Sequence, residues 1–143
     1  MNQADRPAAG LFALLQAADS VQAHVDARLS RLGLSLPKLA ALGVLKDAGE
    51  SLPLSQLAER LSCVKSNITQ LVDRLEADGF VSRAPDPNDR RARLAVLTTA
   101  GRVICDEGLK LRDEAERELF GQLSADEARQ LAALVGKVAA GTK

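Results

Sequence analysis

The hydrophobic period of this chain changes at Gly79, and this change constrains the fold more than any other feature. Before Gly79, apolar residues recur at helical spacing in a short run that begins at Ser55 and in a longer run from 65 to 78. A short turn around Ser62 and Cys63 separates the two runs. We therefore predict a helix-turn-helix whose first helix is capped by Ser55.

After Gly79 the apolar residues alternate as they do in half-buried strands. The pattern predicts one strand over 80–84 and a second over about 93–97. Between them, the segment Asp86-Pro87-Asn88-Asp89 carries aspartate and proline at the positions that a type I turn favours. A β-hairpin that follows a helix-turn-helix directly is a wing.

Capping signals define the helices on either side of this unit. A first helix is predicted over 7–32, with Asp5 as a possible cap and Gly33 as its stop. The other predicted elements are a helix over 36–48 with Pro37 in its first turn, an extended segment over 52–54, a helix over 99–120 capped by Thr98, and a last helix to about 139 that opens with a Ser124–Glu127 capping box.

The composition excludes several kinds of protein. Lys and Arg total 19, as do Asp and Glu, so any attraction to phosphate must come from local placement of charge. The first residues are polar, no apolar run approaches the roughly 20 residues that span a bilayer, and two cysteines fit a reducing compartment. We expect a soluble, cytoplasmic protein with no membrane partner. Three Phe without Tyr or Trp provide no stacking platform for single-stranded nucleic acid.

The run from Leu54 to Gly101 resembles one family. With LVDRLEADGFVSR followed by DPNDRRARLAVLTTAG, it is similar to the MarR family of bacterial regulators, and the helix order extends the likeness over nearly the whole chain. The resemblance implies a triangular homodimer that meets double-stranded DNA through one winged domain per subunit. It also implies repression that is relieved by a small-molecule effector or by oxidation, with a ligand cavity between the dimer helices and the winged domain.

The expected fold class is therefore mainly α with a small β wing (α+β). We predict a winged helix-turn-helix with long N- and C-terminal dimerisation helices. The divisions are an N-terminal dimerisation helix (1–34), a winged DNA-binding domain (35–98) and C-terminal dimerisation helices (99–143), which together form one compact unit.

The polar face of the predicted recognition helix supplies candidate DNA contacts. Short polar side chains and amides near the N-terminal end of such a helix can meet base edges in the major groove, whereas basic and hydroxyl groups position it on phosphates. The candidate base readers are Ser66, Asn67 and Gln70, and the candidate phosphate contacts are Lys65, Thr69 and Arg74. The alternative interpretation is a solvated polar face on an ordinary helix.

Arginines crowd the tip of the predicted wing. Arg90, Arg91 and Arg93 are candidates for a narrow minor groove, where the potential is most negative. Asp89 is placed to hold the Arg91 guanidinium through a bidentate pair. In the MarR family an Asp and an Arg at this spacing play that role. The alternative is a surface salt bridge of little consequence.

One position departs from the family pattern. Relatives usually carry Ser, Asp or Thr where Val64 stands, and valine cannot cap a helix through its side chain. Three outcomes remain open: Ser62 takes over the cap, Lys65-Ser66 does so, or the start of the recognition helix frays.

Apolar stripes on the first and last helices predict a dimer. These stripes are longer than one small core needs, so we expect them to pack against a second subunit. The alternative is that both stripes fold back onto their own subunit. A two-fold pair would read half-sites about 10 base pairs apart, and therefore a pseudo-palindromic operator. The stripe residues are Leu11, Leu15, Ala18, Val25, Leu29 and Leu32 in the first helix and Leu131, Leu134, Val135 and Val138 in the last.

The signal that releases DNA is less defined by sequence. Cys63 is a redox candidate because its oxidation would disturb the adjacent recognition helix, although it and Cys105 are more readily read as small core residues. The single histidine, His24, has no clustered partner, so no metal site and no cofactor is expected. We name no ligand-pocket residues.

Two other classes of function remain as alternatives. A helical protein-binding adaptor could use a winged-helix fold without DNA, and its support is the near-neutral winged segment, where 54–93 holds seven Lys+Arg against six Asp+Glu. An enzyme is disfavoured because the chain has one histidine, no metal-ligand spacing, no P-loop and no G-x-G-x-x-G.

Overall fold

The computed structural model describes residues 8–61 and 67–142, and for residues 8 and 9 the backbone only. The elements run α1 (Ala8–Leu29), a 3₁₀ turn η2 (Ser30–Leu32), α2 (Leu36–Asp47), β1 (Ser51–Pro53), α3 (Leu54–Arg60), α4 (Ile68–Ala77), β2 (Val81–Asp86), β3 (Asp89–Leu97), α5 (Thr99–Phe120) and α6 (Ala125–Ala140). The predicted α+β fold class, with a helix-turn-helix followed by a wing, is confirmed.

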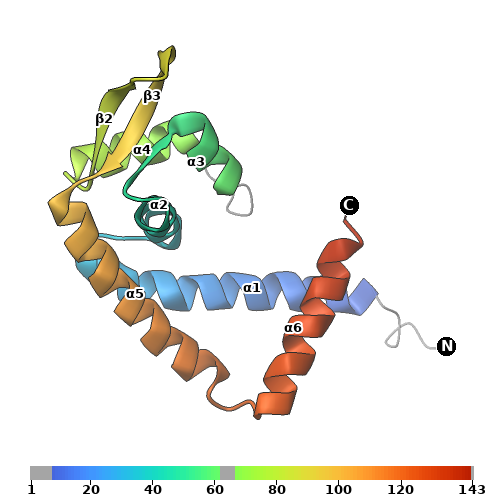
Figure 1. Ribbon diagram of the computed structural model, residues 1–143. Helices are drawn as coiled ribbons and strands as arrows, with labels where there is room; N and C mark the ends of the chain where they lie inside the picture. Colours follow the sequence, from blue (N-terminus) through green and yellow to red (C-terminus); the bar gives the residue numbers. More distant parts are fainter. Residues whose placement is uncertain (1–7, 62–66, 143) are drawn as a thin grey trace.

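The winged unit is organised around a small antiparallel sheet. Its strand order is β1-β3-β2, and β3 pairs with β1 through Leu52 and Ala95 and with β2 through Val81 and Leu97. The helices α2, α3 and α4 gather beside this sheet (Figure 1). The side chains that fill the space between them are leucines and valines, and each such burial contributes roughly 1.5–3 kcal/mol. The most enclosed are Leu42, Leu45, Leu57, Val72 and Leu75.

Two long helices carry this unit. The C-terminal half of α1 packs against α5, where Val25, Leu29 and Ala115 are buried. Nearer the N-terminal end of α5, Gly108 lies so close to α2 that an added Cβ would sit 2.7 Å from Cδ1 of Leu39. A larger side chain at this position would therefore require the side chains of Leu39 and Leu34 to shift.

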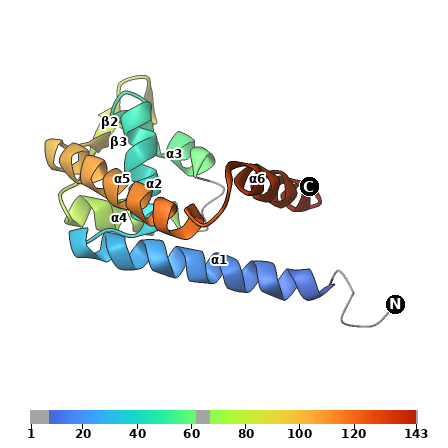
Figure 2. The same cartoon turned by 90° about the horizontal axis from the view of Figure 1, so that it is seen from below.

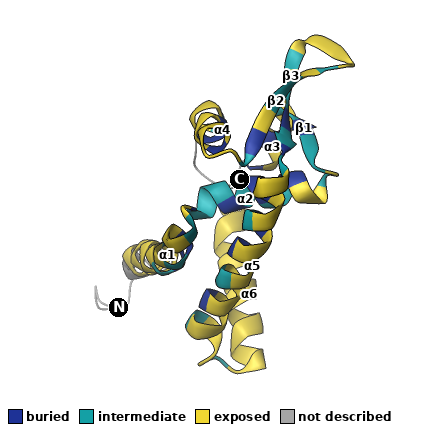
Figure 3. Ribbon diagram, turned by 90° about the vertical axis from the view of Figure 1, so that its left-hand side faces the viewer, coloured by how far each residue is buried: buried dark blue, intermediate teal, exposed yellow. Residues whose placement is uncertain are grey.

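The N-terminal half of α1 and the whole of α6, which we call the arms, are left uncovered. The N-terminal half of α1 extends past the winged unit and α5, and α6 stands apart from the winged unit (Figure 2). No residue of α6 is buried, and the exposed class covers most of both segments (Figure 3). The apolar stripe of α1 is buried only at its C-terminal end, at Val25 and Leu29. At the other end, Leu11 and Leu15 are more than half exposed.

Most predicted helix boundaries agree with the structure. The hydroxyl of Thr98 accepts a hydrogen bond from the backbone N–H of Gly101, and Ser124 and Glu127 form the reciprocal capping box. The first helix ends at Leu29 rather than at 32, and the 3₁₀ turn leads to Gly33, whose φ is +72°. Asp5, its possible cap, lies outside the described residues.

The predicted cap of the first helix of the helix-turn-helix is wrong. Pro53 is the N-cap residue of α3, no side chain caps that helix, and Ser55 lies inside its first turn. The physical reason is that β1 leads straight into α3, so the backbone that precedes the helix is already fixed by its pairing with β3.

Candidate nucleic-acid interface

The recognition helix begins later than the sequence pattern predicts. Asn67, in an extended conformation, is the N-cap of α4, and its Oδ1 accepts hydrogen bonds from the backbone N–H groups of Thr69 (3.0 Å) and Gln70 (3.3 Å). Asn67 therefore takes the capping role that the sequence left open between Ser62 and Lys65-Ser66, while the fraying alternative concerns residues outside the described ranges. Asparagine is among the best N-cap residues because its oxygen satisfies donors that the first turn leaves free. Lys65, Ser66 and Cys63 lie outside the described residues.

This cap changes the part that Asn67 can play. Reading an adenine requires both the oxygen and the amino group of the carboxamide, and the oxygen of Asn67 is already bound to the backbone. In this arrangement only the side-chain amino group of Asn67 is left to meet DNA, and its part as a base reader stays a prediction. The sequence contained a signal for this cap, since Asn67 directly precedes Ile68, the first apolar residue of the helix. The family pattern at Val64 placed the predicted boundary earlier.

The outer face of α4 is open to solvent. Thr69, Gln70 and Arg74 are exposed, whereas Leu71 and Val72 hold the opposite face against the core. Three candidates of the recognition helix therefore share an accessible surface.

The wing is longer than predicted. Only Pro87 and Asn88 form its turn, and Asp86 accepts a hydrogen bond from the backbone N–H of Asn88 at 2.9 Å. The pairing with β2 jumps from Arg93 opposite Pro85 to Asp89 opposite Asp86. Residues 90–92 therefore form a bulge in β3 that has no partner positions across the hairpin, and a bulge re-aims the side chains it carries.

The three wing arginines are available for an external partner. Arg90, Arg91 and Arg93 are all exposed, and within 8–61 and 67–142 none of them forms an ion pair. Asp89 does not hold the Arg91 guanidinium as predicted. Instead its Oδ1 accepts a hydrogen bond from the backbone N–H of Arg91 at 2.9 Å, because the bulge turns that N–H back toward it.

An arginine that the sequence interpretation missed joins the two reading elements. From β2, Arg83 reaches α4 and donates to Oδ1 of Asp73 (2.6 Å) and to Oε1 of Glu76 (2.8 Å). We call this pair of contacts the Arg83 brace. Hydrogen bonding to Asp73 raises the pKa of Arg83 further, and the guanidinium stays charged. No local sequence signal reports a contact between a helix and the strand that follows it.

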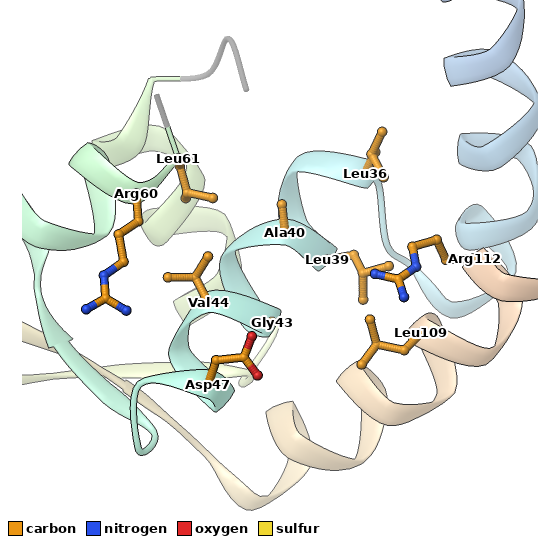
Figure 4. Close-up of a pocket in the computed structure, with 10 residues that line it drawn as sticks. All are labelled: Leu36, Leu39, Ala40, Gly43, Val44, Asp47, Arg60, Leu61, Leu109 and Arg112. Atoms are coloured by element: carbon orange, nitrogen blue, oxygen red, sulfur yellow. The ribbon is translucent and has the colours of Figure 1, made fainter. Parts of the chain in front are cut away.

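A pocket opens between α2, the end of α3 and α5, with a volume of about 290 Å³. Its floor is apolar and includes Leu39, Val44 and Leu109, and Arg60 and Arg112 lie on either side of α2 (Figure 4). A second groove of about 460 Å³ runs between the outer ends of α1 and α6 and is lined by Leu11, Leu14, Leu131, Leu134, Val135 and Val138. Both are predominantly apolar.

The remaining candidates have ordinary surroundings. Cys105 is buried, and burial raises the pKa of its thiol, so thiolate chemistry is suppressed there. Nε2 of His24 lies 3.0 Å from Oε2 of Glu118, across the contact between α1 and α5. Among the described residues, no group of three or more His, Cys, Asp or Glu side chains has the arrangement of a metal site. No helix in that part of the chain is long and apolar enough to cross a membrane.

Comparisons with known proteins point to one family. The MarR family model matches residues 34–92. The multiple antibiotic resistance protein MarR of Escherichia coli is 35% identical over 111 residues, which cover 77% of this chain and 76% of that protein. A crystal structure of a mutant MarR from E. coli complexed with operator DNA superimposes with a TM-score of 0.79 at 30% identity, covering 90% of this chain and 93% of that one. A probable transcriptional regulator from Pseudomonas aeruginosa gives a TM-score of 0.81 at 28% identity, covering 96% and 99%.

Proposed function

This chain belongs to the MarR family of transcriptional regulators, and from that membership we propose that it represses transcription by binding a pseudo-palindromic operator in double-stranded DNA as a homodimer. The observation that carries the proposal is the joint surface of α4 and the wing. The Arg83 brace links an exposed polar helix face to a hairpin whose three arginines have no ion-pair partner among the described residues.

Each element has a distinct part in this proposal. Gln70, near the N-terminal end of α4, reads base edges in the major groove, where a carboxamide can pair with adenine. Thr69 and Arg74 contact phosphates and fix the register of the helix. Arg90, Arg91 and Arg93 approach the adjacent minor groove, and Asp89 orients Arg91 through its backbone. Lys65 and Ser66 are proposed contacts from outside the described residues.

The homodimer is proposed from the uncovered arms. An amphipathic helix without a buried residue, such as α6, gains its apolar burial only from a partner. A second copy that covers the groove between α1 and α6 supplies it, in line with dimerisation helices over 1–34 and 99–143 that flank a winged domain over 35–98. Two winged domains then read the two half-sites.

Release from DNA is proposed to follow binding of a small molecule. The pocket between α2, α3 and α5 lies between the dimer arms and the winged unit, so its occupancy can bias the separation of the two DNA-binding surfaces. Oxidation of Cys63 is the second candidate signal. We propose no enzymatic activity and no cofactor, and we place the protein in the cytoplasm, where its DNA target is.

A titration of double-stranded DNA tests the function. The fragment upstream of this protein's own coding region is titrated at two salt concentrations, followed by genomic fragment selection if it does not bind. We expect Arg91→Ala to weaken binding about tenfold and to lower the salt slope by about 1, and Gln70→Ala to relax sequence preference. Lys110→Ala, an exposed basic residue on α5, is the charge-matched control. Absence of salt-dependent binding to any fragment would favour the protein-binding adaptor.

A further inference from the structure

Two carboxylates stand on the exposed side of the recognition helix, where a DNA-reading surface is expected to be neutral or basic. Asp73 and Glu76 lie one turn apart on α4, with side chains 57% and 43% exposed. Both are bound by Arg83, whose own side chain is only 20% exposed. In the protein, these two carboxylates therefore accept the hydrogen bonds that Arg83 of β2 donates.

The geometry of this contact suits a mechanical role. A guanidinium presents its donors in a rigid planar fork, and here two different nitrogens, Nη1 and Nη2, each bind one carboxylate. Two bonds to residues one turn apart fix both the position and the direction of α4 relative to β2. A single ion pair would leave rotation about its axis free.

The brace adds a two-point side-chain connection to the packing that joins the wing to α4. The helix packs against β2, while β3, which carries the three arginines, pairs with β2 and β1 and packs against α2 and α3. Any change in the angle between β2 and α4 is therefore passed along the hairpin to its tip. Isolated surface ion pairs contribute little to stability, so loss of the brace alters this angle without unfolding the domain.

We propose that Arg83 is a positioning residue for DNA recognition, and that its brace to Asp73 and Glu76 holds the wing at the angle from which its arginines reach DNA while α4 occupies the major groove. This inference rests on the proposed DNA-binding function. Arg83 itself contacts no DNA. Its effect is transmitted through Arg91 and its neighbours in the wing.

A double-mutant cycle on operator DNA distinguishes positioning from direct contact. Arg83→Met and Arg91→Ala are each expected to weaken binding about tenfold, whereas the double variant is weaker than either single variant by only about threefold, since coupled sites are not additive. Full additivity, about a hundredfold, would show that Arg83 contributes independently of the wing and would overturn the proposal. Arg102→Met, which removes an ion pair with Glu50 outside both reading elements, is the matched control.

The carboxylate side of the brace provides a second test. Asp73→Ala/Glu76→Ala removes two negative charges next to DNA, so electrostatics alone predicts tighter binding. Positioning predicts weaker binding, because Arg83 loses both of its partners. Tighter binding than that of the parent protein would contradict the proposal.

Amide hydrogen exchange of the free protein gives a readout that does not need DNA. Arg83→Met is expected to raise exchange in β2 and β3 near the tip while leaving the core of α2 and α5 unchanged and the thermal midpoint close to that of the parent. Unchanged exchange in the hairpin would refute the brace. If the parent protein binds no DNA, the proposed function fails, whereas additivity or unchanged exchange rejects only the role of Arg83.

Discussion

Oδ1 of Asp89 lies 2.9 Å from the backbone nitrogen of Arg91 and accepts its hydrogen bond. An aspartate that binds the backbone two residues ahead forms a local turn and leaves the guanidinium of that arginine free. In this chain the turn lies in the bulge of β3, at the place where the hairpin loses its regular pairing. The aspartate thus shapes the backbone from which Arg91 projects.

This relationship predicts different effects for two substitutions of Asp89. Asp89→Asn retains an oxygen that can accept the Arg91 N–H, so DNA affinity is expected to remain close to that of the parent. Asp89→Ala removes the acceptor, which costs about 1 kcal/mol, or about fivefold in affinity. Binding titrations of both variants check this. Equal losses in the two variants would instead support the ion pair with the guanidinium that the sequence suggested.

The N-cap of α4 is expected to contribute to stability. Asn67→Ala leaves the N–H groups of Thr69 and Gln70 without their acceptor and should lower the free energy of unfolding by about 1 kcal/mol. Asn67→Ser restores an acceptor and is expected to retain most of the stability. Urea denaturation measures both, with Thr69→Ala as a control on the same turn. A neutral Asn67→Ala would place the true cap elsewhere.

The exposed apolar face of α6 is expected to form the dimer interface, and a charge placed on this face should separate the two subunits. Leu134, which is 61% exposed, lies in the groove between α1 and α6, and Leu134→Asp should convert the dimer to a monomer. Ala133→Asp places the same charge on the opposite side of α6 and should leave the dimer intact. Sedimentation velocity at several concentrations separates the two outcomes. A dimer that survives Leu134→Asp would show that this face does not form the interface.

The contact between α1 and α5 predicts a pH dependence. Hydrogen bonds from His24, and then from Arg28, hold the pKa of the Glu118 carboxyl below its usual value of 4.5. Because the folded-state pKa is depressed, the contribution of Glu118 to stability is present above pH 4.5 and is lost as the pH falls through the folded-state pKa.

Denaturation of Glu118→Gln at neutral pH and at about pH 3 checks this expectation, since the difference from the parent should shrink on acidification. Glu116→Gln, also exposed and on the same helix, is the control. A difference that stays constant with pH would mean that the carboxylate charge of Glu118 does not stabilise the contact.

Local sequence determined the identity and order of the elements. Period, caps and turn residues act within a few positions of one another, so Thr98, the Ser124–Glu127 box and the Pro87-Asn88 turn were readable without a fold. The same locality explains why the exposed face of α4, with Gln70 and Arg74, could be predicted from the spacing of its buried leucines.

The tertiary structure decided what depends on contacts between elements. Arg83 meets Asp73 and Glu76 only after β2 folds beside α4, and the bulge at residues 90–92 arises from the register of β3 against β2. Ser55 failed as a cap because pairing of β1 with β3 had already set the backbone before α3. These features follow from the packing of distant segments, whose energies no local pattern of residues encodes.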